Sequence, residues 1–203
     1  MCLFIDGNEF VETICVEHGR VYNLSYHNER MNRTRRVFWG ENVEVLQLED
    51  YIHPQQYEKR TRCRVVYGKS IVKVEYFMYH IREVNSLKLV HCDEAIYSYK
   101  STDRSLLNAL YEKREDNDDV LIVRNGLLTD TSIANIALFD GVNWYTPVHP
   151  LLKGTRRQSL LDERILFERD INISEIGNYQ KIALFNAMIP FRTIELDIEA
   201  INR

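Results

Sequence analysis

The chain has 203 residues, of which 45% are hydrophobic and 28% are charged, and its formal net charge at pH 7 is −4. This length allows one large domain or two small ones, and the composition is ordinary for a globular protein. The weakly acidic total predicts no general affinity for nucleic acid. No stretch approaches the roughly 18 consecutive apolar residues of a membrane helix, so no membrane partner is expected.

The cysteines and the N-terminus indicate the compartment. Four cysteines stand at positions 2, 15, 63 and 92 without metal-ligand spacing, and the six histidines show neither metal nor triad spacing. We therefore expect reduced thiols and no metal site. The segment MCLFIDGNEF has an acidic residue and no basic segment before a long apolar run, so a signal peptide is not expected. These features predict a soluble cytoplasmic protein.

The first part of the chain mixes extended and helical patterns. In chain order, we expect strands at 10–16 and 20–24, a helix at 27–40, a short helix within 48–59, and a hairpin of strands at 62–68 and 70–81. A polar stretch at 82–86 then separates two β-rich regions. We place the domain boundary there, which gives predicted domains of residues 1–84 and 85–203.

The second part alternates between strands and helices. We expect strands at 94–100, 119–124, 133–139, 142–146 and 181–188, and helices at 101–115 and 155–168. The dipeptides Asn125-Gly126 and Asp140-Gly141 are strong hairpin signals. The whole pattern predicts an α+β fold with antiparallel strands in both domains.

Three features of the second part are candidates for a chemical role. Lys100 ends a predicted strand and precedes a helix, a junction that often faces a cleft, although a single lysine is more often a solvated surface residue. Asp130 is either part of a polar loop or a buried carboxylate. Gly154 leads a predicted helix, whose first N–H groups favour an anion, although a solvated basic face explains it equally. A lysine, a carboxylate and a Gly-led helix start are the groups that pyridoxal phosphate requires.

Arg30 lies in the arginine-rich segment HNERMNRTRR at 27–36. The simplest interpretation is a solvated amphipathic helix, and a nucleic-acid patch is disfavoured by the acidic total. A third interpretation is that one arginine turns inward and binds a phosphate through two parallel hydrogen bonds.

Four ordered segments resemble the class IV aminotransferases, the fold-type IV pyridoxal phosphate enzymes. They are VETICVEHGRVYNLSYHNERM (11–31), YKSTDRSLL (99–107), NGLLTDTSIANIALF (125–139) and LLKGTRRQSLL (151–161). The resemblance implies a two-domain fold like that of the D-amino-acid aminotransferases, with a shortened N-terminal domain. It also implies a homodimer that binds pyridoxal 5'-phosphate.

The resemblance assigns roles residue by residue. It makes Lys100 the catalytic lysine that binds the cofactor covalently, and it makes Asp130 the carboxylate that pairs with the ring nitrogen. A His-x-x-Arg pattern falls on His27 and Arg30 and assigns Arg30 to the phosphate. The remaining cofactor-binding residues that it implies are Asn135, Leu152 against the ring, Gly154, and the backbone amides of Thr155 and Arg156.

Three departures from the family pattern bear on these roles. The family usually has glutamate where this chain has Asp130, which is one methylene shorter. It often has a hydroxyl residue where this chain has Arg156. The chain also lacks the leading strands and much of the first-domain loop that shapes the substrate pocket in the family.

Within the family, FNAMIPFRTI (185–194) is most similar to the 4-amino-4-deoxychorismate lyases. This favours a lyase that forms 4-aminobenzoate and pyruvate. The alternative is an aminotransferase acting on D-amino or branched-chain amino acids, which would use the same residues. A further alternative is a non-catalytic protein that binds an acidic partner through Arg30, Arg33, Arg35 and Arg36.

Overall fold

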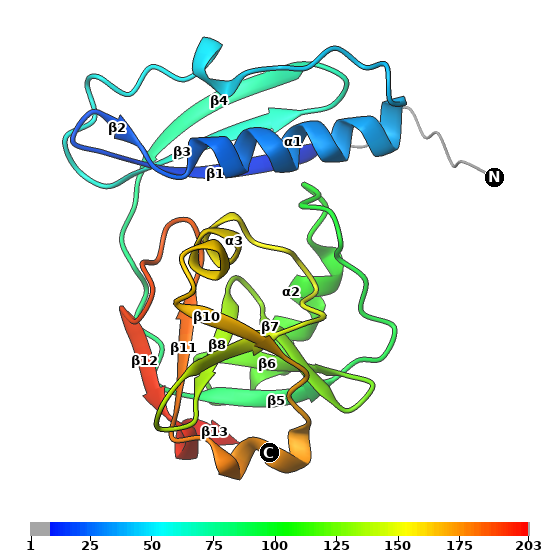
Figure 1. Cartoon of the computed structure of the whole chain (residues 1–203), viewed down its shortest axis with the longest axis vertical. Helices are drawn as coiled ribbons and strands as arrows, with labels where there is room; N and C mark the ends of the chain where they lie inside the picture. The colour runs from blue at the N-terminus through cyan, green and yellow to red at the C-terminus, as the bar shows by residue number, and fades with distance from the viewer. Residues whose placement is uncertain (1–8, 203) are drawn as a thin grey trace. The chain divides into compact units, whose positions relative to one another are not determined.

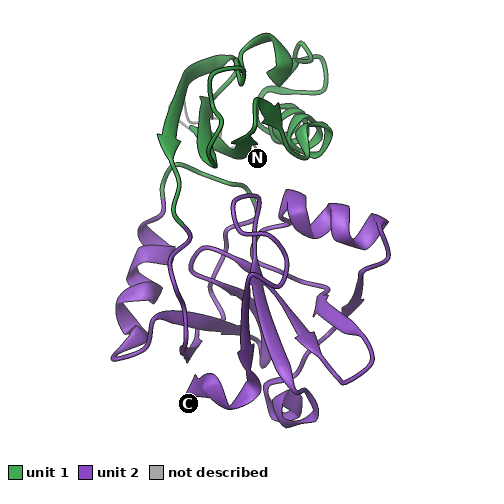
Figure 2. Cartoon of the chain, turned by 90° about the vertical axis from the view of Figure 1, so that its left-hand side faces the viewer, with its two compact units in different colours: residues 1–80, 99–103 green, residues 81–98, 104–203 purple. Residues whose placement is uncertain are grey.

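The computed structural model describes residues 9–202, and they form two compact units (Figure 2). The first unit contains the chain up to His80 together with Tyr99–Asp103, and the second contains Ile81–Ser98 and Arg104 onward. Within the described residues, no helix is long and apolar enough to cross a membrane. The predicted absence of a signal peptide concerns residues that lie mostly outside the described range.

The first unit is a four-stranded antiparallel sheet with one long helix across one face (Figure 1). Its strand order is β2-β1-β3-β4. The elements are β1 (Phe10–Glu17), β2 (Arg20–Val21), α1 (Leu24–Trp39), the 3₁₀ helix η1 (Leu48–Asp50), β3 (Thr61–Tyr67) and β4 (Ile71–Met78). The predicted helix at 27–40 and the hairpin at 62–81 are thereby confirmed, whereas the helix expected within 48–59 is reduced to η1.

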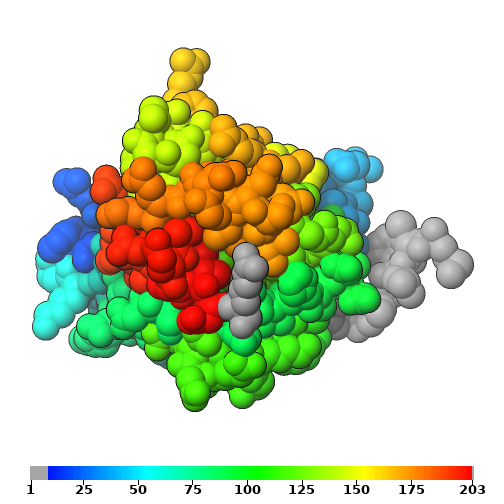
Figure 3. All heavy atoms as spheres, turned by 90° about the horizontal axis from the view of Figure 1, so that it is seen from below, coloured from blue at the N-terminus to red at the C-terminus, as the bar shows by residue number. Residues whose placement is uncertain are grey.

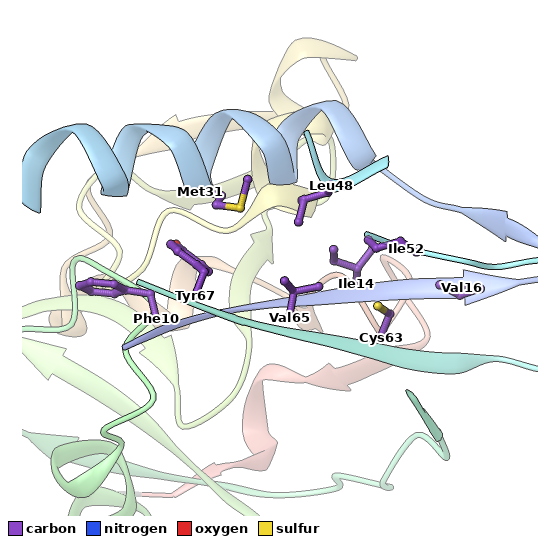
Figure 4. Close-up of a cluster of buried hydrophobic side chains, with 9 residues drawn as sticks. All are labelled: Phe10, Ile14, Val16, Met31, Leu48, Ile52, Cys63, Val65 and Tyr67. Atoms are coloured by element: carbon purple, nitrogen blue, oxygen red, sulfur yellow. The ribbon is translucent and has the colours of Figure 1, made fainter. Parts of the chain in front are cut away.

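The core of the first unit lies between the sheet and α1. Alternation along β1 turns Phe10, Ile14 and Val16 toward the helix, and Met31 reaches down from α1 to meet them (Figure 4). Because strand residues two apart share a face, Glu12 falls on this same apolar face, and its side chain is fully buried. A charged residue at such a position requires partners.

The predicted strand at 94–100 is wrong. The segment is irregular, and its aromatic residues anchor it at two separate places: Tyr97 packs in the core around α2 in the second unit, and Tyr99 packs against the core of the first unit. The following backbone adds to β1, since the N–H of Val11 donates to the C=O of Lys100 at 2.8 Å and that of Thr102 donates to Glu9 at 3.0 Å. Apolar residues that serve as anchors thus produced a strand-like pattern without a strand.

The second unit is built on a nine-stranded mixed sheet with few helices. Its main path is β10-β9-β8-β7-β6-β5-β13, and β11 pairs with both β8 and β12. The strands are β5 (Leu87–His91), β6 (Asp119–Arg124), β7 (Leu127–Thr131), β8 (Asn135–Phe139), β9 (Trp144–Pro147), β10 (Leu166–Arg169), β11 (Lys181–Phe185), β12 (Ile194–Asp197) and β13 (Ile201–Asn202). The helices are α2 (Ser105–Tyr111), α3 (Thr155–Asp162), and the 3₁₀ helices η2 (Glu112–Arg114), η3 (Ile173–Asn178) and η4 (Ile198–Ala200). This mixture confirms the predicted α+β class.

Turn chemistry fixes the strands that matter for the site. Asn125 and Gly126 both have positive φ, 51° and 76°, as a type I′ turn requires, and they join β6 to β7. The polar run that begins at Thr129 consequently lies in strand β7 and is buried.

The C-terminal segment lies beside the segment that ends near residue 180 (Figure 3). The N–H of Ile198 donates to the C=O of Gln180 at 2.9 Å.

Two predicted helices are too long. The helix expected at 101–115 begins only at Ser105, because the preceding residues pair with β1, and it ends in η2. The helix expected at 155–168 ends at Asp162, and Arg164 adopts a positive φ of 57° just beyond it. The chain then enters β10, which pairs in parallel with β9. Strand pairing therefore overrode the helical pattern.

Candidate active site

In the second unit, a buried network joins Asp130 on β7, Asn135 on β8 and the backbone of Leu152. Asp130 and Asn135 are directly paired across the two strands. Asn135 Nδ2 donates to Asp130 Oδ1 at 2.8 Å and to the C=O of Leu152 at 2.8 Å. The N–H of Leu152 donates to Asp130 Oδ2, also at 2.8 Å. The network therefore holds the carboxylate in one orientation and ties it to the segment that leads into α3.

The turn between β7 and β8 is held from outside the hairpin. Arg104 Nη2 donates to the C=O of Ser132 at 2.8 Å, and Asn186 Nδ2 donates to the C=O of Ile133 at 3.0 Å. Thr131 Oγ1 also accepts from the N–H of Ala134 at 3.0 Å. These contacts make the hairpin a rigid support for the carboxylate.

Asp130 is a buried carboxylate. Burial raises its pKa to about 6, against the lowering effects of its hydrogen bonds with Leu152 and Asn135 and of the charge of Arg157. Within residues 9–202, Asp130 makes no ion pair. A protonated ring nitrogen placed against it would supply the missing positive charge, which is the chemistry that the sequence assigns to this position.

Gly154 allows α3 to begin close to this network. A Cβ built on Gly154 would lie 3.2 Å from Asn135 Cγ and would overlap its Oδ1, so a side chain does not fit. Thr155 follows as the first, buried residue of α3. The first N–H groups of a helix have no partner within the helix, and its dipole favours an anion there. The helix start is thus suited to a phosphate.

The two arginines of α3 make different contacts. Arg156 extends along its own helix, where Nη1 lies 3.1 Å from Ser159 Oγ and 3.5 Å from Glu163 Oε1. Arg157, which the sequence did not single out, is buried and donates Nη2 to the C=O of Pro147 at 2.7 Å and to Glu168 Oε1 at 2.6 Å. Nothing in its polar surroundings in the sequence distinguished it from a surface arginine.

In the first unit, Arg30 and Lys100 lie around β1. Arg30 projects from α1 and is buried, and Lys100 is half-buried on the segment that pairs with β1. Arg30 Nε donates to Glu12 Oε1 at 2.9 Å, and its Nη2 donates to Glu12 Oε2. Glu12 was not among the predicted site residues, although a glutamate within an alternating apolar strand was a signal that could have revealed it.

The burial of two arginines contradicts the alternative in which the arginines of α1 form a surface patch for an acidic partner. Arg35 is almost fully buried and donates to the C=O of Glu44 at 2.5 Å and to that of Lys69 at 2.6 Å. Arg30 is engaged with Glu12 as described. A surface patch made of Arg30, Arg33, Arg35 and Arg36 therefore does not exist on α1.

Each unit, taken by itself, contains groups that suit part of an anionic cofactor with a basic ring nitrogen: a buried guanidinium in the first, and a buried carboxylate and a helix start in the second. The sequence model of the amino-transferase class IV family matches residues 9–196. The chain belongs to this family. It is therefore an enzyme, and its cofactor is pyridoxal phosphate, as the sequence predicts.

The chain is also similar to individual proteins over most of its length. An uncharacterized protein from Haemophilus influenzae strain Rd is 38% identical over 181 residues, which cover 87% of this chain and 96% of that protein. A solved structure from Haemophilus somnus 129PT, provisionally assigned as a 4-amino-4-deoxychorismate lyase, is 32% identical with a TM-score of 0.83 and covers 91% of this chain and 98% of its own. A hypothetical aminotransferase from Mycobacterium tuberculosis, solved with pyridoxal phosphate bound, shares the fold with a TM-score of 0.78 at 16% identity, covering 97% of this chain and 82% of its own.

Proposed function

We propose that the enzyme is a pyridoxal phosphate-dependent lyase that converts 4-amino-4-deoxychorismate to 4-aminobenzoate and pyruvate. The observation that carries this choice is the near full-length similarity to the Haemophilus somnus protein of that assignment. The resemblance of the segment at 185–194 to the lyases supports it. In this segment, Asn186 Oδ1 accepts from the N–H groups of Met188 and Ile189 at 2.8 and 3.0 Å, which fixes the backbone after β11.

Each predicted site residue has a task in this proposal. When bound, the cofactor supplies an electron sink that makes the proton on the substrate's α-carbon acidic. The Lys100 amine binds the cofactor covalently and then moves protons at the substrate. Asp130 holds the proton on the ring nitrogen, and Asn135 holds Asp130 in place.

The phosphate and the ring have their own contacts in the proposal. Arg30 and the N–H groups of Thr155 and Arg156 bind the phosphate, Gly154 lets the backbone approach it, and Leu152 packs on the ring. The fit of these residues rests on what they offer: a buried guanidinium, a helix start, and a buried carboxylate that makes no ion pair within residues 9–202.

The runner-up is an aminotransferase acting on D-amino or branched-chain amino acids. A solved structure from Mesorhizobium loti that shares this fold at a TM-score of 0.77 is provisionally assigned as an amino-acid aminotransferase, and it motivates this alternative. To separate the two, purified enzyme loaded with pyridoxal phosphate is incubated with 4-amino-4-deoxychorismate, and separately with D-alanine or branched-chain amino acids plus 2-oxoglutarate. Release of 4-aminobenzoate and pyruvate in equal amounts supports the lyase. Amino transfer without that release contradicts it.

We further propose that the enzyme is a homodimer and that it is located in the cytoplasm. We also propose that the chain is divided into domains of residues 1–84 and 85–203. The free thiols of Cys15, Cys63 and Cys92 are consistent with a reducing compartment. Analytical ultracentrifugation tests the assembly, because a monomer at micromolar concentration would contradict it.

A further inference from the structure

One carboxylate in the first unit holds two side chains of α1 at once. Glu12 lies on β1 beneath the helix, and its side chain is completely buried. His27 Nδ1 lies 2.6 Å from Glu12 Oε2, while Arg30 binds the same carboxylate through both Nε and Nη2. His27 and Arg30 are three residues apart on α1 and so share a face. Glu12 thereby fixes both the position and the plane of the guanidinium.

The charges in this cluster are settled by its geometry. Burial alone would raise the pKa of Glu12, but the charge of Arg30 and the hydrogen bonds from His27 and Arg30 lower it to about 2. Burial lowers the pKa of His27, against the raising effect of Glu12. An ionised carboxylate only accepts hydrogen bonds, so neutral His27 carries its proton on Nδ1. The cluster is a carboxylate and guanidinium pair with a neutral imidazole.

The same stretch of β1 also fixes Lys100. The N–H of Val11, the residue next to Glu12, donates to the C=O of Lys100 at 2.8 Å. Two successive residues of one strand therefore hold the two groups that, in the proposed site, bind neighbouring substituents of one cofactor. The backbone of Val11 holds the lysine segment, and the side chain of Glu12 holds Arg30. At these residues β1 pairs with β3 on one side and, through Val11, with the Lys100 segment on the other, so it is a well-supported frame.

We propose that Glu12 is a positioning residue, which orients Arg30 toward the cofactor phosphate and sets its spacing from Lys100. This inference rests on the proposed role of Arg30. A purely electrostatic role for Glu12 has the opposite consequence, because its negative charge opposes the binding of a phosphate, and its removal would tighten that binding.

The test compares pyridoxal phosphate with pyridoxal, the same ring without the phosphate. The dissociation constants of both are measured for the apoprotein by absorbance titration, in wild type, Glu12→Gln and Glu12→Asp. A general loss of stability weakens the binding of both ligands alike, whereas misplacement of Arg30 weakens only the binding of the phosphate form. We expect both variants to reduce the preference for pyridoxal phosphate by about 10- to 100-fold, the typical effect of losing a hydrogen bond to a charged group.

Glu17 provides a matched control on the same strand. It binds Arg60 through Nε and Nη2 at 3.4 and 2.9 Å, the same arrangement that Glu12 makes with Arg30. Glu17→Gln and Glu17→Asp should leave the preference unchanged. A tighter phosphate preference in Glu12→Gln, or an unchanged one in both Glu12 variants, overturns the proposal. Glu12→Asp keeps the charge and carries the test if Glu12→Gln does not fold.

The outcome also separates this inference from the proposed function. If wild type binds the two ligands equally, the phosphate site itself is refuted. If wild type prefers pyridoxal phosphate and the Glu12 variants do so equally, only the role of Glu12 is refuted. In an Arg30→Ala background, Glu12→Gln should have no further effect on the preference, because the group that it positions is gone.

Discussion

Gly154 and Asn135 approach each other so closely that no side chain fits between them. Gly154 is the residue before α3, and Asn135 holds Asp130 from the neighbouring strand, so their contact joins the start of the helix to the carboxylate network. The contact explains why glycine stands at a position whose backbone angles, φ −72° and ψ 147°, any residue could adopt.

The first prediction concerns this contact. Gly154→Ala should displace Asn135 and destabilise the protein by about 1–3 kcal/mol, the usual cost of overpacking. The affinity for pyridoxal phosphate should fall with it, because both the helix start and Asp130 move. Urea unfolding and cofactor titration measure the two effects. Gly177→Ala is the control, since a Cβ there meets nothing within 4 Å; equal effects in the two variants would refute the argument.

The second prediction concerns Lys100. Lys100→Ala should remove the visible absorbance of the bound cofactor and lower turnover by at least about 10²–10⁴-fold, because the covalent anchor and the proton carrier are one group. Absorbance spectra and product assays check this. Lys113→Ala, at an exposed position on η2, should behave like wild type. Full activity of Lys100→Ala would rule out the proposed role.

The third prediction is a pH dependence caused by Asp130. Its pKa in the folded protein, about 6, exceeds its ordinary value of 3.8. The stability that the protonated carboxyl contributes is therefore fully present below pH 3.8 and is lost as the pH rises through 6, by up to about 3 kcal/mol. Asp130→Asn should abolish this loss in the apoprotein and should be inactive.

Unfolding by urea at a series of pH values measures the effect of Asp130. The exposed Asp162 supplies the control, because Asp162→Asn should retain the wild-type pH profile. The prediction is wrong if the stability of Asp130→Asn depends on pH between 4 and 6 as strongly as that of wild type does.

The fourth prediction has the opposite sign and a lower pH window. The pKa of Glu12 in the folded protein, about 2, is below its ordinary value of 4.5. Its contribution is present above pH 4.5 and is lost as the pH falls toward 2, by about 3 kcal/mol at most. Glu12→Gln should be less stable at pH 7 and should lack this part of the acid transition. Circular dichroism during acid titration measures it; an unaltered transition would contradict the prediction.

Some features of the site were predictable because their signals are local in the sequence. Asn125-Gly126 predicted the turn after β6, and Gly154 predicted the start of a helix. Strand β7 was not among the expected elements, so the pairing of Asp130 with Asn135 on adjacent strands was not predicted. The ends of the helices at 101–115 and 155–168 were wrong, because helical periodicity does not report the strand pairing that ends a helix.

The sequence by itself determined the α+β class, the family and the kind of cofactor, because turn dipeptides, periodic patterns and ordered motifs are properties of neighbouring residues. Tertiary structure alone decided the partners of the buried charges. Glu12 meets Arg30 from 18 residues away. Such pairs form only when folding removes both groups from water, and no local pattern in the chain encodes which charge will be compensated by which.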